Sequence, residues 1–431
     1  MEPLLGAAGF ALVVLLALAG MPVAIAMGAV GAIGLALTAG PQTAGFMLGR
    51  TTFEAVFPYS LSIVPLFIAM GVFAGHAGLS RALYGFVATL VGHLRGGLAM
   101  ATVGGSAIFG AVSGSAIATA ATMGRVALPE MRRHGYADAL ACATVAAGGT
   151  LGVMIPPSIL FVVYGLATEQ SIGRLFFAGI LPGLLGAVLY ALAVAWSVRR
   201  DPASGPAGPR HGWLERGRAL FAIWQVALLF GLVLGGMYLG WFSPTEGAAV
   251  GAAGAVALAA LSGRLTRDTL RDAIAETATT TGMIFVILIG AGIFNAFVES
   301  TRMTDALIDA VRATGLGPWT VMALLMATYV VLGALMDELS MILLTIGPVF
   351  KLVTALGFDP IWFGVMLVTV CEIGMIVPPI GINLFVIQGI AGVPLATVVR
   401  GILPFAFADV VRLVLLSLCP WLATWLPSRM I

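Results

Sequence analysis

A double proline follows a glycine-containing apolar run at two places in the chain, Gly148-Gly149-Thr150-Leu151-Gly152-Val153-Met154-Ile155-Pro156-Pro157 and Glu372-Ile373-Gly374-Met375-Ile376-Val377-Pro378-Pro379. Each proline removes a backbone donor and restricts the residue before it, so two in succession interrupt a helix. The runs lie inside long hydrophobic stretches, 138–165 and 360–390. The sequence therefore predicts two membrane helices that are unwound near their middle.

The composition around these runs is that of a polytopic membrane protein. The 431 residues are 60% hydrophobic and 9% charged, with a mean hydropathy of +1.07, whereas a soluble protein carries about 25% charge. The net charge of +2, without a long basic run, argues against a nucleic-acid partner. Cys142, Cys371 and Cys419 lie far apart in apolar stretches and lack the spacing of metal ligands.

Ten stretches are apolar and long enough to cross a bilayer core about 30 Å thick, which needs about 20 helical residues. They are roughly 4–20, 22–39, 56–76, 138–165, 173–198, 219–240, 244–262, 278–298, 360–390 and 397–425. Two further apolar regions, 98–130 and 318–355, are interrupted by small or polar residues. We expect these two regions to be re-entrant helical hairpins, because irregular backbone at membrane depth is tolerated only where protein or a cavity surrounds it.

The prolines and glycines repeat at an offset of 222 residues. The matching positions are Pro156-Pro157 and Pro378-Pro379, Gly152 and Gly374, and Gly179-Ile180-Leu181-Pro182 and Gly401-Ile402-Leu403-Pro404. The offset indicates two homologous halves, 1–198 and 219–431, joined by a linker at 199–218.

Basic residues predict how the halves face the membrane. The linker is expected in the cytoplasm because it contains Arg199, Arg200, Arg210, Arg216 and Arg218. Counting crossings from the linker places both termini on the periplasmic side and makes the two hairpins enter from opposite faces. The amphipathic segment 264–274 is expected to lie flat on the cytoplasmic surface. The expected fold is an all-α polytopic protein with an inverted-topology repeat, an architecture that binds substrates near the membrane midplane.

Small polar residues mark the tip of the first hairpin. Helix N-termini there can attract an anion, and hydroxyls and free carbonyls can hold a hard cation such as Na⁺. The predicted Na⁺ ligands of the first half are Ser113, Ser115, Gly149 and Thr150. Ser115 and Thr119 are predicted to contact substrate. The competing interpretation of these small residues is close helix packing.

Carboxylates take the equivalent positions in the second half. Asp337 corresponds to Ser115, and Glu372 corresponds to Thr150. A carboxylate at membrane depth is costly to insert, which indicates a function. We predict Asp337 as an Na⁺ ligand in preference to the neighbouring Glu338. Glu372 is either a further Na⁺ ligand or an acceptor that caps unwound backbone.

Four other polar residues are less decisive. Asn383 follows the second double proline and is predicted to donate a hydrogen bond to a substrate carboxylate. Arg125 either pairs with an anionic substrate or anchors the hairpin at the basic inner face, and the anchor interpretation is favoured. Asp409 and Arg412 have the spacing of an ion pair within one helix.

Several motifs resemble those of one known family, the large membrane subunit (DctM type) of tripartite ATP-independent periplasmic (TRAP) transporters. The similar segments are Gly110-Ala111-Val112-Ser113-Gly114-Ser115-Ala116-Ile117-Ala118-Thr119-Ala120, Gly148 through Ser158, Gly179-Ile180-Leu181-Pro182-Gly183, Glu372 through Pro379, and Gly381-Ile382-Asn383-Leu384-Phe385. The resemblance extends over essentially the whole chain.

The resemblance implies Na⁺-driven import of an organic acid, such as a C4-dicarboxylate, across the bacterial inner membrane. It implies an elevator movement of the hairpin-bearing domain against a scaffold. It also implies two partners, a small membrane subunit of about four helices and a soluble periplasmic binding protein. Because the chain starts directly at the large-subunit region, the small subunit is expected to be a separate protein.

Other functions compete with this one. A stand-alone ion-coupled carboxylate carrier would need no binding protein. A non-transporting scaffold fits the paired hairpins poorly, and an intramembrane enzyme would need a nucleophile and base that the sequence does not bring together. We therefore expect a transporter and not an enzyme, with C4-dicarboxylates, keto acids, sugar acids and sialic acid all compatible as substrates.

Overall fold

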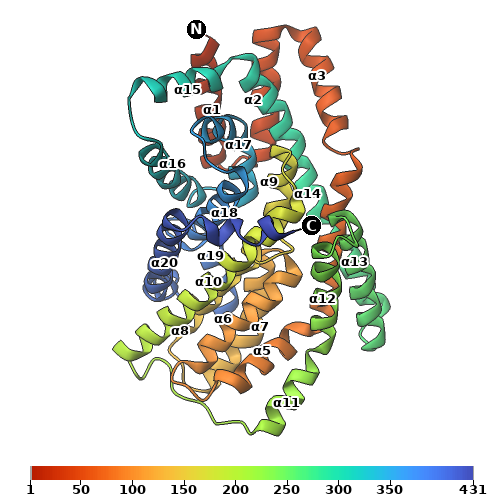
Figure 1. Ribbon diagram of the computed structural model, residues 1–431, viewed down its shortest axis with the longest axis vertical. Coiled ribbons are helices and arrows are strands. Elements are labelled where there is room, and N and C mark those ends of the chain that lie inside the picture. The colour runs from red at the N-terminus through yellow and green to blue at the C-terminus, as the bar shows by residue number, and fades with distance from the viewer. Residues whose placement is uncertain (1, 431) are drawn as a thin grey trace.

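The structure is a computed structural model that describes residues 2–430, and every regular element in this range is a helix (Figure 1). Seven helices are long and apolar enough to span a membrane, and a bent pair, α11 (Trp213–Ala222) and α12 (Trp224–Tyr238), brings the number to eight. Other stretches that were expected to cross form shorter apolar helices. The expected all-α class is confirmed.

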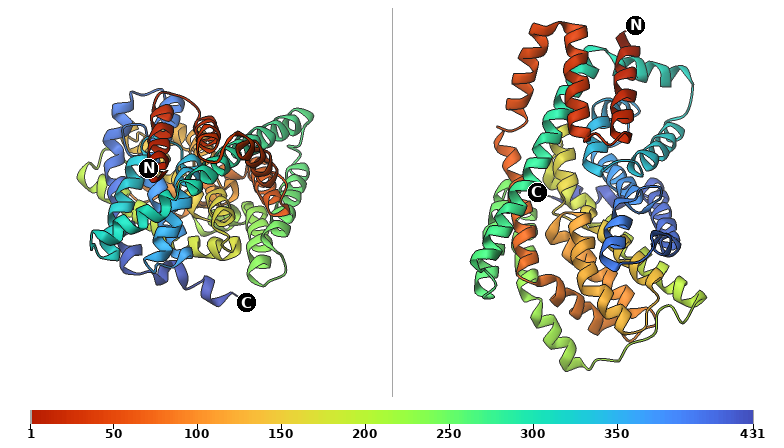
Figure 2. Two further views of the ribbon diagram at one scale, coloured as in Figure 1. Left: turned by 90° about the horizontal axis from the view of Figure 1, so that it is seen from above. Right: turned by 180° about the vertical axis from the view of Figure 1, so that it is seen from behind.

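One group of helices, the frame bundle, packs together along one flank of the molecule (Figures 1 and 2). Its members are α1 (Glu2–Leu18), α2 (Val23–Ala39), α3 (Pro41–Glu54), α4 (Ile63–His76), α12, α13 (Pro244–Leu261) and α14 (Arg267–Ser300). Glycine brings α2 and α14 close together: a Cβ on Gly31 would lie 2.8 Å from the backbone of Phe294. Small residues allow such close contact between membrane helices.

The remaining long helices form the core bundle. They are α6 (Gly97–Ser113), α7 (Ala116–Arg133), α8 (Asp138–Met154), α9 (Ile159–Thr168), α10 (Ile172–Arg200), α16 (Pro318–Gly333), α17 (Glu338–Ala355), α18 (Pro360–Ile376), α19 (Ile382–Ala391) and α20 (Leu395–Leu418). α8 and α18 lie at its centre, since residues 140–154 and 361–376 are all buried. The short α21 (Trp421–Thr424) and η2 (Pro427–Arg429) pack on α10.

Short helices connect the two bundles. α5 (Leu79–Val91) contacts α4 on one side and α6 and α7 on the other, and α15 (Met303–Ala313) contacts α1, α14 and α17. The bundles also touch directly, where α4 meets α6 and α9 and where α14 meets α17. At Gly71 in α4, a Cβ would lie 2.8 Å from Cα of Ser113. The frame bundle therefore rests against the end of α6.

The predicted interruptions are present in the structure. α6 and α7 are separated at Gly114, which has a φ of 63°, and α16 and α17 are separated at residues 334–337. We call these the first tip (113–115) and the second tip (334–337). α8 and α9 are separated at the first break (155–158), and α18 and α19 at the second break (377–381). Each break contains a cis peptide bond between its two prolines, Pro156-Pro157 and Pro378-Pro379.

The helix bounds repeat at the offset that the sequence indicates. Adding 222 to the bounds of α7 gives 338–355, which are the bounds of α17, and adding it to those of α8 gives 360–376, which are the bounds of α18. α1, α2 and α5 correspond in the same way to α12, α13 and α15, to within two residues at each end. These five helices thus recur in the same order in the second half.

One element departs from this pattern and corrects an expectation. α14 is a single helix of 34 residues, whereas the first half has α3, η1 (Tyr59–Ser62) and α4 in its place. Pro58 precedes η1, and the equivalent position in α14 is Thr280, which leaves the helix uninterrupted. The prediction that 264–274 lies flat on the cytoplasmic surface was therefore wrong, because residues from Arg267 onward are part of the same helix as the span.

The close packing of α2 on α14 leads to a stability prediction. Gly31→Val places side-chain atoms against the Phe294 backbone, and we expect it to lower the free energy of unfolding by about 1–3 kcal/mol. Gly28→Ala is the control, since its Cβ would approach Gly290 Cα only to 3.7 Å. Thermal unfolding of the purified variants in detergent measures both effects. Equal losses in the two variants would contradict the predicted packing.

Candidate functional site

Three predicted site residues meet at the first tip. The hydroxyl of Ser113 lies 2.6 Å from that of Thr119, and both side chains are buried. The same Ser113 oxygen is 3.3 Å from the carbonyls of Gly110 and Ser115. The tip therefore gathers hydroxyl and carbonyl oxygens, the ligands that hard cations prefer.

The first tip packs on the first break. A Cβ on Gly114 would lie 3.0 Å from the carbonyl oxygen of Pro157, and one on Gly152 would lie 2.7 Å from Oγ1 of Thr119 and 3.1 Å from the carbonyl of Ser115. Residues with side chains at Gly114 or Gly152 would push the tip away from the break. Because these two glycines have no Cβ, the tip can lie close against the break.

Two helices begin at this junction. Ser115 is the N-cap of α7 and accepts a hydrogen bond from the backbone N–H of Ala118 (3.4 Å). Ser158 is the N-cap of α9, where its hydroxyl accepts from Phe161 N (3.4 Å) and donates to the carbonyl of Val153. Helix N-termini carry a partial positive charge and free N–H groups, which suit an anionic group.

Ser158 was not among the predicted site residues. Its signal was present in the sequence, because a serine directly before an apolar helical run is typical of an N-cap. The double proline drew attention to the interruption, and the residue that restarts the helix lies immediately after it.

The second tip carries a carboxylate with a structural contact. Asp337 is the N-cap of α17, and its Oδ1 accepts a hydrogen bond from Ser340 N at 2.9 Å. It thus occupies the same position in its helix as Ser115 does in α7. The neighbouring Glu338 has one buried carboxylate oxygen, Oε2, without a hydrogen-bond partner among residues 2–430.

Two residues predicted at the unwound first break lie elsewhere. Gly149 and Thr150 are inside α8, whose hydrogen bonding continues to Ile155, so the prediction of unwound backbone at these positions was wrong. Gly149 packs on α7, where a Cβ would lie 2.6 Å from that of Ala120. The physical reason is that Pro156 and Pro157 restrict only the residues next to them, so the helix runs up to the break.

Two predicted substrate contacts are not at the tips. Asn383 is buried in α19, and its Nδ2 donates to the carbonyl of Ala146 in α8 at 3.1 Å. Its Oδ1 has no partner among the described residues. Arg125 lies on the exposed side of α7, a position that suits the anchor interpretation.

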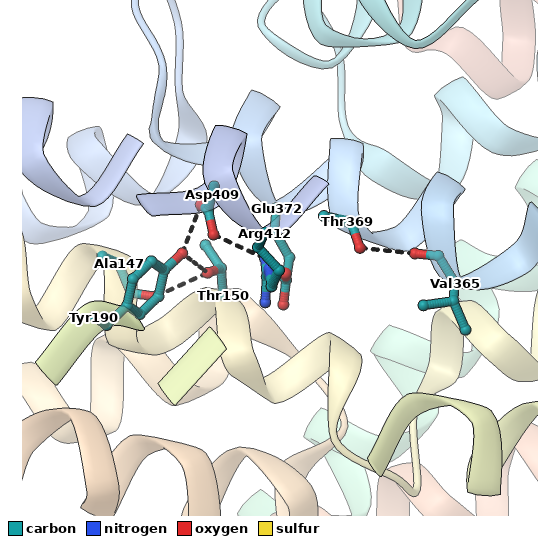
Figure 3. Close-up of polar contacts among 8 residues, drawn as sticks. All are labelled: Ala147, Thr150, Tyr190, Val365, Thr369, Glu372, Asp409 and Arg412. Atoms are coloured by element: carbon teal, nitrogen blue, oxygen red, sulfur yellow. Dashed lines mark hydrogen bonds and ion pairs between the residues drawn. The ribbon is translucent and has the colours of Figure 1, made fainter. Parts of the chain in front are cut away.

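A buried polar cluster joins four helices in the middle of the core bundle (Figure 3). Arg412 in α20 pairs with Asp409, its neighbour one turn earlier, at 2.8 Å, and with Glu372 in α18. Tyr190 in α10 donates to Oδ2 of Asp409 at 2.6 Å, and its oxygen lies 3.1 Å from the hydroxyl of Thr150 in α8. All five side chains are buried.

The cluster confirms one predicted contact and corrects another. Asp409 and Arg412 form the expected ion pair. Glu372 does not cap unwound backbone, because it lies within α18 and its Oε2 contacts Arg412. The residues Thr150 and Tyr190 are 222 positions before Glu372 and Arg412, so the first half places a neutral pair where the second half places a charged one.

Two carboxylates share one guanidinium in this cluster, which determines the cost of removing each group. Arg412→Leu leaves Glu372 and Asp409 buried without their cation, and we expect a loss of about 3–5 kcal/mol in the free energy of unfolding. Glu372→Gln leaves the Arg412–Asp409 pair intact and is expected to cost about 1 kcal/mol. Thermal unfolding compares the two variants.

The control for this comparison is an exposed ion pair. Arg50 and Glu54 are 2.7 Å apart, with side chains 57% and 58% exposed. Arg50→Leu is expected to cost roughly 0–1 kcal/mol, because water screens such pairs. A loss in Arg412→Leu no larger than that in Arg50→Leu would show that the buried cluster does not stabilise the core bundle.

Comparison with known proteins identifies the family. The family described as "Tripartite ATP-independent periplasmic transporter, DctM component" matches residues 10–422.

The chain belongs to the DctM family of TRAP transporters.

Relatives with assigned names are permeases of the same kind. The C4-dicarboxylate TRAP transporter large permease protein DctM of Pseudomonas aeruginosa is 36% identical, over 87% of this chain and 88% of that protein. The protein of the same name from Vibrio cholerae is 32% identical, over 97% of this chain and 96% of its own length. Further DctM-family relatives are named for isethionate, sialic acid and ectoine. This DctM-family chain is therefore a transporter permease, which agrees with the expectation that it is not an enzyme.

Solved structures show the same fold at lower identity. The YdaH transporter of Alcanivorax borkumensis superposes with a TM-score of 0.59 and 18% identity, covering 90% of this chain and 88% of that one. The family match and the permease relatives, together with the long apolar helices, make this DctM-family chain a multi-pass membrane protein.

Proposed function

We propose that the protein couples Na⁺ entry to the import of an organic acid, a C4-dicarboxylate or a related carboxylate, across the bacterial inner membrane. The observation that carries this proposal is the first tip, where the N-termini of α7 and α9 meet beside the oxygens of Ser113, Ser115 and Thr119. The N–H groups suit a carboxylate, and the oxygens suit Na⁺. Relatives named for C4-dicarboxylates support the substrate class.

The contacts of the predicted Na⁺ ligands divide them into two sets. Ser113 and Ser115 lie at the first tip and Asp337 lies at the second, and the proposal keeps one Na⁺ site at each tip. Gly149 and Thr150 lie inside α8, and Glu372 is paired with Arg412. We assign these three residues to helix packing and to the buried cluster.

The proposed movement is that of an elevator, in which the core bundle moves against the frame bundle. Support comes from the division of the helices into two bundles that touch through few elements, and from connectors, α5 and α15, that contact both. The matching helix bounds at an offset of 222 residues support an inverted repeat, in which the two tips enter from opposite faces.

Two partners complete the proposed transporter, a small membrane subunit of about four helices and a soluble periplasmic binding protein. The family's description as one component of a tripartite periplasmic transporter supports this arrangement. Both termini are proposed to face the periplasm, with the linker and its arginines in the cytoplasm. The competing function is a stand-alone carboxylate carrier.

The Na⁺ site is tested by changing charge without changing the helix cap. Asp337→Asn keeps an oxygen that caps α17, because asparagine caps about as well as aspartate. If Asp337 binds Na⁺, the Na⁺ concentration for half-maximal uptake into proteoliposomes rises about tenfold, equivalent to about 1.4 kcal/mol. The uptake assay uses the complete transporter with its binding protein.

The matched control is a second N-cap aspartate far from the tips. Asp359 caps α18 and accepts from Trp362 N at 2.8 Å. Asp359→Asn is expected to leave the Na⁺ dependence unchanged. If Asp337→Asn and Asp359→Asn have the same Na⁺ dependence as the unchanged protein, Asp337 is not a ligand of the coupling ion.

The tripartite arrangement has its own test. Proteoliposomes that contain the large and small membrane subunits are expected to take up substrate only when the binding protein is added and an inward Na⁺ gradient is imposed. Uptake without the binding protein would favour the stand-alone carrier. Uptake that needs the binding protein but no Na⁺ gradient would contradict the coupling while leaving the tripartite assembly intact.

A further inference from the structure

An apolar groove runs between α10 and α20 on the outside of the core bundle. Its volume is about 770 Å³. Leu192 and Trp196 of α10 and Leu403 and Phe407 of α20 line it, and these side chains are between 47% and 70% exposed. The charged residue of this lining is Arg400. The groove is therefore apolar along its length and carries a cation at one position.

The two helices that form the groove run antiparallel. Gly186 of α10 faces the guanidinium of Arg412 in α20, and one turn later Tyr190 packs on Phe405 with ring centroids 5.6 Å apart. Moving toward the C-terminus of α10 thus leads toward the N-terminus of α20. The last turns of α10 lie beside the first turns of α20.

This arrangement gathers cations and a tryptophan at one end of the groove. Trp196 and Arg400 line the groove together, and the guanidinium of Arg200 lies 4.1 Å from the centroid of the Trp196 ring. Within residues 2–430, neither Arg200 nor Arg400 forms an ion pair with a carboxylate. The two guanidinium groups suit a phosphate, and the apolar groove beside them suits the acyl chains attached to it.

The cationic end lies on the side of the linker. Gly401, next to Arg400, packs on the backbone of Ala139 in the first turn of α8. Gly205 of the linker packs on Leu140 of the same turn and on Val198 of α10. The distribution of arginines predicts that this side faces the cytoplasm, where the membrane leaflet carries anionic lipids.

We propose that this groove binds one anionic phospholipid of the inner leaflet. Its acyl chains lie between α10 and α20, and its phosphate is held by Arg200 and Arg400. Trp196 lies at the level of the headgroup, where amphipathic rings are enriched in membrane proteins. Because α10 belongs to the first half and α20 to the second, the lipid stabilises the contact between the halves on the outer side of the cluster around Arg412.

Native mass spectrometry of the detergent-purified protein tests the site with phosphatidylglycerol as the probe. We expect one phosphatidylglycerol to remain bound when phosphatidylcholine is lost, and free glycerol phosphate not to compete. The double variant Arg200→Gln/Arg400→Gln is expected to retain the lipid at least about tenfold less. The control is Arg267→Gln/Arg271→Gln, which removes two exposed arginines of α14 and is expected to change nothing.

A second variant fills the groove and keeps its charge. Ala193 lines the groove and is 8% exposed, so Ala193→Phe is expected to displace the acyl chains and abolish retention of the lipid. Equal retention of phosphatidylglycerol and phosphatidylcholine, or unchanged retention in both groove variants, would overturn the proposal. The co-purified small subunit could instead displace the lipid and cross-link to the Phe407→Cys variant. That result would make the groove a subunit interface and would also overturn the proposal.

Discussion

The structure depends on one constraint, that backbone N–H and C=O groups at membrane depth need partners inside the protein. This chain interrupts its helices at two tips and two breaks, and each interruption would expose unpaired groups. N-cap side chains satisfy some of these backbone groups. Ser115, Ser158 and Asp337 accept hydrogen bonds from backbone N–H groups at the starts of α7, α9 and α17. Burial inside the core bundle keeps lipid away from Pro156, Pro157 and Ser158 at the first break, whereas residues 378–380 at the second break are exposed. At the first tip the interruption leaves the oxygens of Ser113, Ser115 and Thr119 close together, where we propose that an ion binds.

The same constraint explains the two bundles and the cluster between the halves. The frame bundle packs closely through glycines, as at Gly31, and the hydrogen bond between Thr38 of α2 and Ser300 of α14 is exposed. The core bundle contains the interruptions and is joined across the two halves by the hydrogen bond from Tyr190 to Asp409, beside the ion pairs of Arg412. A charged cluster at this depth is costly unless each group is paired. Because the cluster lies between α8, α10, α18 and α20, it holds together the helices that support the first and second breaks.

Local chemistry decided how much of this structure could be predicted from the sequence. The double prolines located the two breaks, and the Gly-Ser segment and the polar residues at 337–338 located the two tips, because each acts on adjacent residues. The 222-residue offset matched five helices of the first half to five of the second. The same local rules explain why α9 begins after Ser158 and why α14 continues through Thr280, although neither feature was predicted. The contact of Glu372 with Arg412 could not be predicted, because it depends on how α18 crosses α20 and not on sequence spacing. The position of Thr150 facing Tyr190 depends on helix rotation in the same way.

Binding of Na⁺ at the tips would stabilise the purified protein in a Na⁺-dependent way, which thermal unfolding measures. A ligand that binds only the folded state raises its thermal midpoint as its concentration increases. We expect Na⁺ to raise the midpoint while K⁺ at equal ionic strength does not. We expect Ser113→Ala to reduce this difference and Arg50→Leu to preserve it. Equal midpoints in Na⁺ and K⁺, or a full Na⁺ effect in Ser113→Ala, would contradict Na⁺ binding at the tips.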